Sequence, residues 1–166
     1  MVKSCLLGAV GIVILVGART LVAQNPATPT FEVVACQAAI RTTWDGVYTD
    51  AQAQRGEAIF NDTCAKCHGR EGSGTSDATD PCHDMTPTTP SCALRGDRFM
   101  ANWSSMTLQN LFDRVRWSMP QDKPQTLTRV DTTLLMAYLL RINGFPAGSI
   151  ELPTDASLLN RLKYVR

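Results

Sequence analysis

The chain is poor in histidine, in net charge and in patterns typical of a β-sheet. It has two histidines among 166 residues, and its 16 basic and 15 acidic side chains leave a formal net charge of +1. A protein this close to neutrality is a poor partner for nucleic acid. The sequence also contains no run of alternating β-branched residues and no internal repeat, which favours helices over a sheet or a repeat array.

One globular domain is expected, because a chain of 166 residues with 44% apolar content can bury one core. The N-terminus differs from the rest. Lys3 precedes an apolar run from Leu6 to Val16 that is too short to span a membrane. With small residues before Gln24, this pattern predicts a signal peptide over residues 1–23 and a periplasmic location. An uncleaved membrane anchor is the alternative.

Residues 24–48 contain two prolines and several threonines, and we expect a lead-in with little structure at its start. The domain is predicted over residues 49–166. Thr49, followed three residues later by Gln52, predicts a capping box at the start of a helix that reaches Asn61. A polar segment from Ser73 to Ser91 predicts a long loop.

Three further helices are predicted downstream. The first follows Thr107, carries an apolar stripe at i, i+3, i+4 and i+7, and stops before Met119. The second is strongly apolar, with Asp131 as its expected cap and a stop at Asn143 and Gly144. The third is a short tail helix suggested by Leu158, Leu159, Leu162 and Val165.

The segment that most narrows the chemistry is Cys64-Ala65-Lys66-Cys67-His68, the C-x-x-C-H pattern of c-type haem attachment. Two thiols at this spacing can add to the two vinyl groups of one porphyrin, and the adjacent imidazole can bind its iron. The alternatives are a thioredoxin-like redox pair, which needs a βαβ setting, and a zinc site. Cys82 and Cys92 could complete four zinc thiolates, although their spacing is unlike a second close pair.

A six-coordinate iron needs a second axial ligand, for which a methionine thioether is the usual choice. Met119 is predicted to be this ligand, because it stands at a helix end before Pro120, where the chain must be extended. Met136 falls in an apolar helix and is expected to be core filler. His83 would be needed for bis-histidine ligation and is expected to be a solvated loop residue. The remaining candidates are Met85, Met100 and Met106.

The order of four segments resembles the class I cytochromes c over nearly all of the chain beyond the predicted signal peptide. They are Q-R-G-E-A-I-F before C-A-K-C-H-G, then A-L-R-G-D-R-F-M-A-N-W, then T-L-Q-N-L-F-D-R-V-R-W-S-M-P, and M-A-Y-L-L-R-I-N-G-F-P-A-G. The resemblance implies an all-α cytochrome c fold, with N- and C-terminal helices crossing around one covalently bound haem c. It places Gly56 and Phe60 against Leu135 and Tyr138, where glycine permits close approach.

The same resemblance implies further site residues. Family members often have a proline where this chain has Cys92, and the carbonyl at that position accepts a hydrogen bond from the haem histidine. Leu94 is expected to pack on the haem face. Trp103 is expected to donate its indole N–H toward a propionate, or else to be a half-buried aromatic with an ordinary partner.

The cysteines outside the haem motif are expected to pair in an oxidising compartment. Our hypothesis is a Cys82–Cys92 disulfide that closes the inserted loop, with Cys36 left over. Three thiols allow three pairings, so the other two stay open.

The function expected from this resemblance is single-electron transfer by a carrier that is not itself an enzyme. The segments W-D-G-V-Y-T-D-A-Q-A-Q-R-G and N-G-F-P-A-G resemble small cytochromes associated with quinoprotein dehydrogenases. This suggests a quinoprotein dehydrogenase as electron donor and an oxidase or another cytochrome as acceptor. The alternative is a haem enzyme or small-ligand sensor with a labile sixth ligand.

Overall fold

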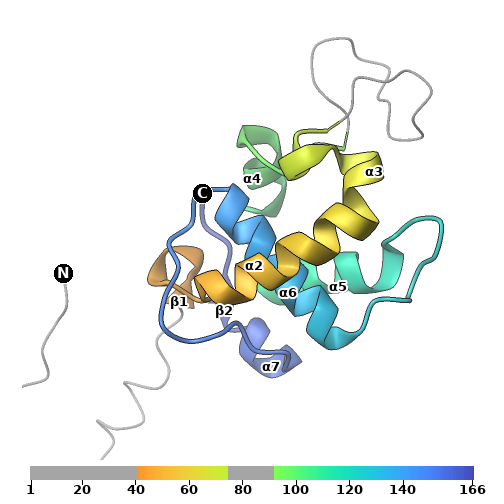
Figure 1. The fold of residues 1–166 in the computed structure, drawn as a ribbon. Coiled ribbons are helices and arrows are strands. Elements are labelled where there is room, and N and C mark those ends of the chain that lie inside the picture. The colour runs from red at the N-terminus through yellow and green to blue at the C-terminus, as the bar shows by residue number, and fades with distance from the viewer. Residues whose placement is uncertain (1–40, 75–91) are drawn as a thin grey trace, which may run out of the picture. The chain divides into compact units, whose positions relative to one another are not determined.

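The computed structural model describes residues 41–74 and 92–166, which fold as a helical body with two very short strands (Figure 1). The predicted signal peptide, Cys36, Cys82, His83 and Met85 lie outside the described residues. In the described part, no helix has the length and apolar content required to cross a membrane. The elements in chain order are β1 (Arg41–Thr42), η1 (Thr43–Asp45), α2 (Asp50–Ile59), η2 (Phe60–Cys64), α3 (Ala65–His68), η3 (Arg70–Gly72), α4 (Asp97–Trp103), α5 (Leu108–Ser118), α6 (Arg129–Ile142), α7 (Ala156–Leu159) and β2 (Leu162–Lys163).

Helix α2 begins at the predicted cap, but the second half of the predicted capping box is absent. The Thr49 side chain accepts a hydrogen bond from the Gln52 backbone N–H at 3.1 Å. The Gln52 side chain instead exchanges two hydrogen bonds with the backbone of Leu152, at 2.9 and 2.8 Å. Gln52 is buried, so its amide needs protein partners. It therefore ties α2 to the C-terminal segment rather than closing its own helix end.

The crossing of α2 and α6 predicted from the family resemblance is confirmed (Figure 1). A Cβ atom built on Gly56 would lie 1.9 Å from the carbonyl oxygen of Leu134 and 3.1 Å from the Cβ of Tyr138. The rings of Phe60 and Tyr138 pack with their centroids 4.9 Å apart. Glycine is required here because the two helix backbones meet without space for a side chain.

Helix α5 spans Leu108–Ser118, beginning after Thr107 and ending before Met119 as predicted. The predicted cap of α6 is wrong by one turn. Thr128 is the N-cap, and Asp131 is the third helical residue, whose carboxylate accepts hydrogen bonds from the Thr128 backbone and hydroxyl. The helix ends at Asn143, as expected.

The predicted tail helix is wrong beyond Leu159. α7 is a single turn, after which Leu162 and Lys163 pair in parallel with Arg41 and Thr42. Leu162 is buried in the hydrophobic core, but it belongs to this strand and not to a helix. Residues 41–48, assigned from sequence to the lead-in, consequently belong to the packed body, where Tyr48 is 1% exposed.

Gly56→Ala is expected to destabilise the protein by about 1–3 kcal/mol, because the added methyl group would overlap the Leu134 backbone carbonyl. In an exposed helix interior the same change would stabilise by roughly 1 kcal/mol. Denaturant unfolding of the purified protein measures the difference. Ala58→Gly, at an exposed position of the same helix, is the matched control and should cost only about 1 kcal/mol. A stabilising effect of Gly56→Ala would contradict the close crossing.

Candidate functional site

The segment with the two cysteines and the histidine follows directly from α2 through a π-helical turn. In η2 the backbone N–H of Ala65 bonds to the carbonyl of Phe60, and α3 then carries the chain to His68. A π-helical turn is wider than an α-helical one and redirects the side chains that follow it. Both cysteine side chains, Cys64 and Cys67, are free thiols in the structure.

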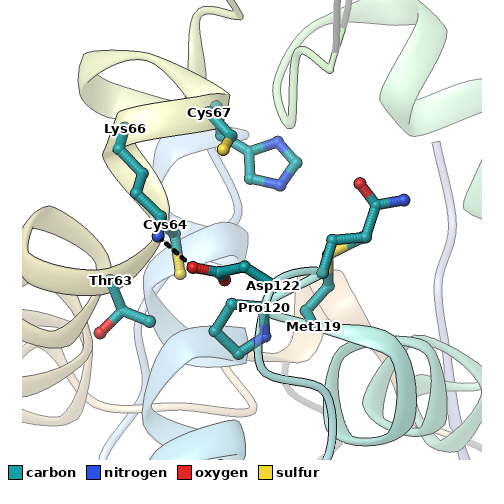
Figure 2. A pocket seen from close by; sticks show the side chains of 9 residues that line it. Thr63, Cys64, Lys66, Cys67, Met119, Pro120 and Asp122 are labelled. Atoms are coloured by element: carbon teal, nitrogen blue, oxygen red, sulfur yellow. Dashed lines mark hydrogen bonds and ion pairs between the residues drawn. The ribbon is translucent and has the colours of Figure 1, made fainter. Parts of the chain in front are cut away.

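Side chains of this segment line two cavities. The outer cavity has a volume of about 440 Å³, and the inner one about 260 Å³. Cys64, His68 and Met119 line both. In the outer cavity, Cys64 and Cys67 lie on one wall, with Met119 and Pro120 on the other (Figure 2). The two cavities therefore share a thiol, an imidazole and a thioether among their lining groups.

All six residues predicted for the site line one or both cavities. Cys64, Cys67, His68 and Met119 line the outer cavity, and Leu94 and Trp103 contribute to the inner one. The other described methionines, Met100, Met106 and Met136, are not among the lining residues. Met136 is fully buried in the hydrophobic core, as expected for a space-filling side chain.

The inner cavity is mostly apolar. Half of its lining residues come from α4, α5 and α6, which explains why an amphipathic α5 and a strongly apolar α6 are needed. Its lining residues are Phe60, Cys64, His68, Cys92, Ala93, Leu94, Phe99, Asn102, Trp103, Leu111, Arg114, Val115, Met119, Leu127, Leu135 and Leu139.

The imidazole of His68 is held by the backbone of Cys92. Its Nδ1 lies 2.7 Å from the Cys92 carbonyl oxygen, as the family resemblance implied. A carbonyl can only accept, so Nδ1 carries the proton and Nε2 keeps its lone pair. A hydrogen bond of this kind fixes the tautomer and the ring orientation of a metal-binding histidine.

Cys92 has a φ of +59°, in the left-handed region. Proline, with φ locked near −65°, cannot adopt this conformation. The chain therefore presents the carbonyl to His68 through a backbone geometry that excludes the residue expected from the family. Cys64 and Cys67 are free thiols, and Cys36 and Cys82 lie outside the described residues, so the Cys82–Cys92 pairing stays a prediction.

Asn143 is a site residue that sequence reasoning recognised only as a helix stop. Its side-chain amide donates to the Leu94 carbonyl at 2.9 Å and accepts from the Gly96 N–H at 3.1 Å. The Leu94 N–H also donates to the Gly72 carbonyl at 2.8 Å. These bonds hold the segment that carries Leu94 between η3 and the end of α6. An asparagine at a helix end predicts a helix cap, but the sequence does not show which other groups its side chain bonds.

Three polar residues, Asn102, Trp103 and Arg114, are among those that line the inner cavity. Among the described residues, no acceptor is found for the Trp103 indole N–H, and no carboxylate pairs with the guanidinium of Arg114. Sequence reasoning missed Arg114, because a lone arginine on a helix usually marks a solvated face, and Arg114 is indeed exposed in the structure. Hydrogen-bond donors beside an apolar wall suit an anionic group at the edge of an apolar ligand.

Charge around the outer cavity is concentrated in one ion pair. Lys66 Nζ lies 2.6 Å from Asp122 Oδ2, and this hydrogen bond raises the pKa of Lys66 and lowers that of Asp122. Burial raises the pKa of the Cys64 thiol to about 11, with a smaller contribution from Cys67. At neutral pH Cys64 is therefore a protonated thiol rather than a thiolate.

The donor set fits a haem iron better than a bare metal ion. In residues 41–74 and 92–166, no group of three His, Cys, Asp or Glu side chains is placed to hold a metal ion. The residues that line the two cavities instead provide an oriented imidazole, a thioether, two free thiols and a broad apolar surface. An apolar surface with a few placed polar groups suits a large flat cofactor.

A family comparison agrees with this geometry. The family model described as "Cytochrome C oxidase, cbb3-type, subunit III" matches residues 51–139, more than half of the chain. No curated protein matches the sequence. Among solved structures, a chain of "Crystal Structure of the Sulfane Dehydrogenase SoxCD from Paracoccus pantotrophus" is 26% identical, with a TM-score of 0.38. The match covers 79% of this chain and 63% of that one, so less than two thirds of the latter.

The matched span runs from the first turn of α2, through Cys64, Cys67 and His68, past Met119 and into α6. It therefore contains the helix crossing and both walls of the site. The chain belongs to the class I cytochromes c, within the family that this cbb3-type cytochrome model describes.

Proposed function

We propose that the chain binds one haem c covalently, with His68 and Met119 as its axial ligands, and passes single electrons between redox proteins in the periplasm. Its family supports electron transfer through haem c. The observation that carries the finer proposal is that Cys64, His68 and Met119 line both cavities. When bound, haem iron supplies a one-electron couple whose potential depends on its ligands and surroundings.

The residues of the C-x-x-C-H segment divide the binding tasks. Cys64 and Cys67, both free thiols, are placed to form thioether bonds to the two vinyl groups, each S–H adding across one double bond. His68 presents Nε2, because Nδ1 is committed to the Cys92 carbonyl. Attachment and one axial ligand thus come from five consecutive residues.

Met119 closes the other side of the site. It caps the C-terminus of α5 in an extended conformation, and its N–H still bonds to the Val115 carbonyl at 3.2 Å. The helix therefore fixes the backbone of Met119, while its side chain lines both cavities. With both axial positions filled, substrate has no access to the metal, which favours a carrier over an enzyme.

The residues that line the inner cavity would surround the cofactor and set its environment. Leu94 and its apolar neighbours exclude water from one face. Trp103 and Arg114, which line the same cavity, are the donors that we propose for the propionates. Exclusion of water and hydrogen bonding at the edge are the means by which a protein tunes a haem potential.

A quinoprotein dehydrogenase is the electron donor that we propose, with an oxidase or another cytochrome as acceptor. The support is the resemblance of residues 44–56 and 143–148 to cytochromes of that group. In the structure these two segments contact each other. The Tyr48 hydroxyl donates to the Phe145 carbonyl at 2.7 Å, and the Trp44 and Phe145 rings lie 4.8 Å apart. The two segments therefore pack against each other in this fold, and an electron-transfer measurement is needed to identify the partner.

The exported protein is expected to have the mass of the chain from Gln24 plus one haem, and to stain for haem after denaturing electrophoresis. Its ferric spectrum should be low-spin, because His68 and Met119 together give a strong ligand field. Mass spectrometry and optical spectroscopy of the purified protein test this. Bound zinc without covalent haem would contradict the proposal. A high-spin ferric spectrum or rapid binding of carbon monoxide would favour a ligand sensor or haem enzyme.

Met119→Ala is expected to convert the ferric haem to a high-spin form that binds carbon monoxide rapidly after reduction, because one axial position is vacated. The reduction potential should fall, since a thioether ligand raises it. Met106→Ala, at a methionine that is 45% exposed and lines neither cavity, is the matched control and should leave the spectra unchanged. A low-spin methionine-ligated spectrum in Met119→Ala would show that another residue is the ligand.

The oxidised holoprotein is expected to be reduced by a quinoprotein alcohol or sugar dehydrogenase in the presence of that enzyme's substrate. Stopped-flow absorbance of the reduced haem measures the rate, which should rise with the dehydrogenase concentration. Omission of the substrate is the control. If only a dehydrogenase with a different cofactor reduces the protein, the proposed donor is wrong while the carrier function stands.

A further inference from the structure

The ion pair between Lys66 and Asp122 joins the two walls of the outer cavity. Lys66 lies within the C-x-x-C-H segment, and Asp122 lies three residues beyond Met119. Their Nζ and Oδ2 atoms are 2.6 Å apart, and both residues line the cavity together with Met119 (Figure 2). Their side chains are 55% and 50% exposed, so the pair lies at the solvent side of the cavity.

The loop that contains Asp122 is otherwise bonded to itself and to α5. The Lys123 N–H donates to the Pro120 carbonyl at 3.0 Å, and Arg116 of α5 donates to the Gln125 carbonyl at 3.1 Å. In the part of the chain that the structure describes, no other hydrogen bond or ion pair joins residues 120–126 to residues 60–72. The pair is therefore the polar link between the wall that carries His68 and the wall that carries Met119.

On the basis of the proposed His68 and Met119 ligation, we propose that Lys66 and Asp122 are positioning residues that hold the Met119 loop closed over the haem. Met119 and Asp122 lie on one short loop. A movement that withdraws the thioether and admits another ligand therefore separates the Lys66–Asp122 pair. The pair opposes this opening and so limits the access of small exogenous ligands to the iron.

The size of the effect follows from the exposure of the pair. Half-exposed ion pairs contribute little, and typical values correspond to a change of about two- to fivefold in an equilibrium constant. The contribution must also fall with salt, because the screening length shrinks to about 3 Å at 1 M ionic strength. A modest, salt-sensitive restraint is what this geometry predicts.

Imidazole binding to the ferric holoprotein tests the proposal, because imidazole must displace Met119 to reach the iron. Lys66→Gln and Asp122→Asn are each expected to raise the imidazole affinity about two- to fivefold. The double variant Lys66→Gln/Asp122→Asn should show no further increase. The double variant Lys66→Glu/Asp122→Lys, which reverses the pair, should recover part of the wild-type resistance.

The Arg55–Glu151 pair provides a matched control. Its N···O distance is 2.5 Å, its side chains are 50% and 51% exposed, and neither residue lines the outer or the inner cavity. Arg55→Gln should therefore leave imidazole affinity at the wild-type value. Raising salt to 1 M should bring the wild type toward the Lys66→Gln value and leave the variant nearly unchanged.

The outcomes separate this proposal from the proposed function. If the wild type has a His/Met spectrum and the Lys66 and Asp122 variants bind imidazole as it does, the positioning role is wrong and the carrier function stands. The same holds if Arg55→Gln raises the affinity equally, since the effect would then reflect general stability. A wild type that lacks methionine ligation overturns both proposals.

Discussion

The close crossing of α2 and α6 at Gly56 is the contact on which the site depends. α2 continues through a π-helical turn into the segment that bears the cysteines and His68, so its direction decides where these side chains lie. α6 contributes Leu135 and Leu139 to the inner cavity. Because a Cβ at Gly56 would overlap the Leu134 carbonyl, these two walls can approach only through a glycine.

Hydrogen bonds to backbone carbonyls then complete the site. The carbonyl of Cys92 orients His68, and the amide of Asn143 holds the neighbouring segment to the end of α6. A main-chain acceptor tolerates any side chain, provided that the backbone reaches the same place. Here it does so with a positive φ that proline cannot adopt, so a departure from the family pattern preserves the hydrogen bond by a different local conformation.

The predicted end of α5 depended on a local pattern, whereas two of the predictions that failed were decided by distant contacts. The end of α5 before Met119 follows from a stripe of apolar residues and a proline. Gln52 was expected to close its own helix, but it bonds to Leu152, 100 residues away. Leu162 fitted a helical spacing, but it lies in a strand because Arg41 offers its backbone as a partner. Neither partner can be identified from a local pattern.

The sequence by itself indicated the chemistry of this protein, because C-x-x-C-H is the pattern of c-type haem attachment and places two thiols and an imidazole within five consecutive residues. It also predicted Met119 as the methionine that completes the site. Only the tertiary structure decided that His68 and Met119 line the same cavities, and that Lys66 meets Asp122 across them. Spacing along a helix is a local property, whereas the convergence of two walls depends on how α2, α5 and α6 pack.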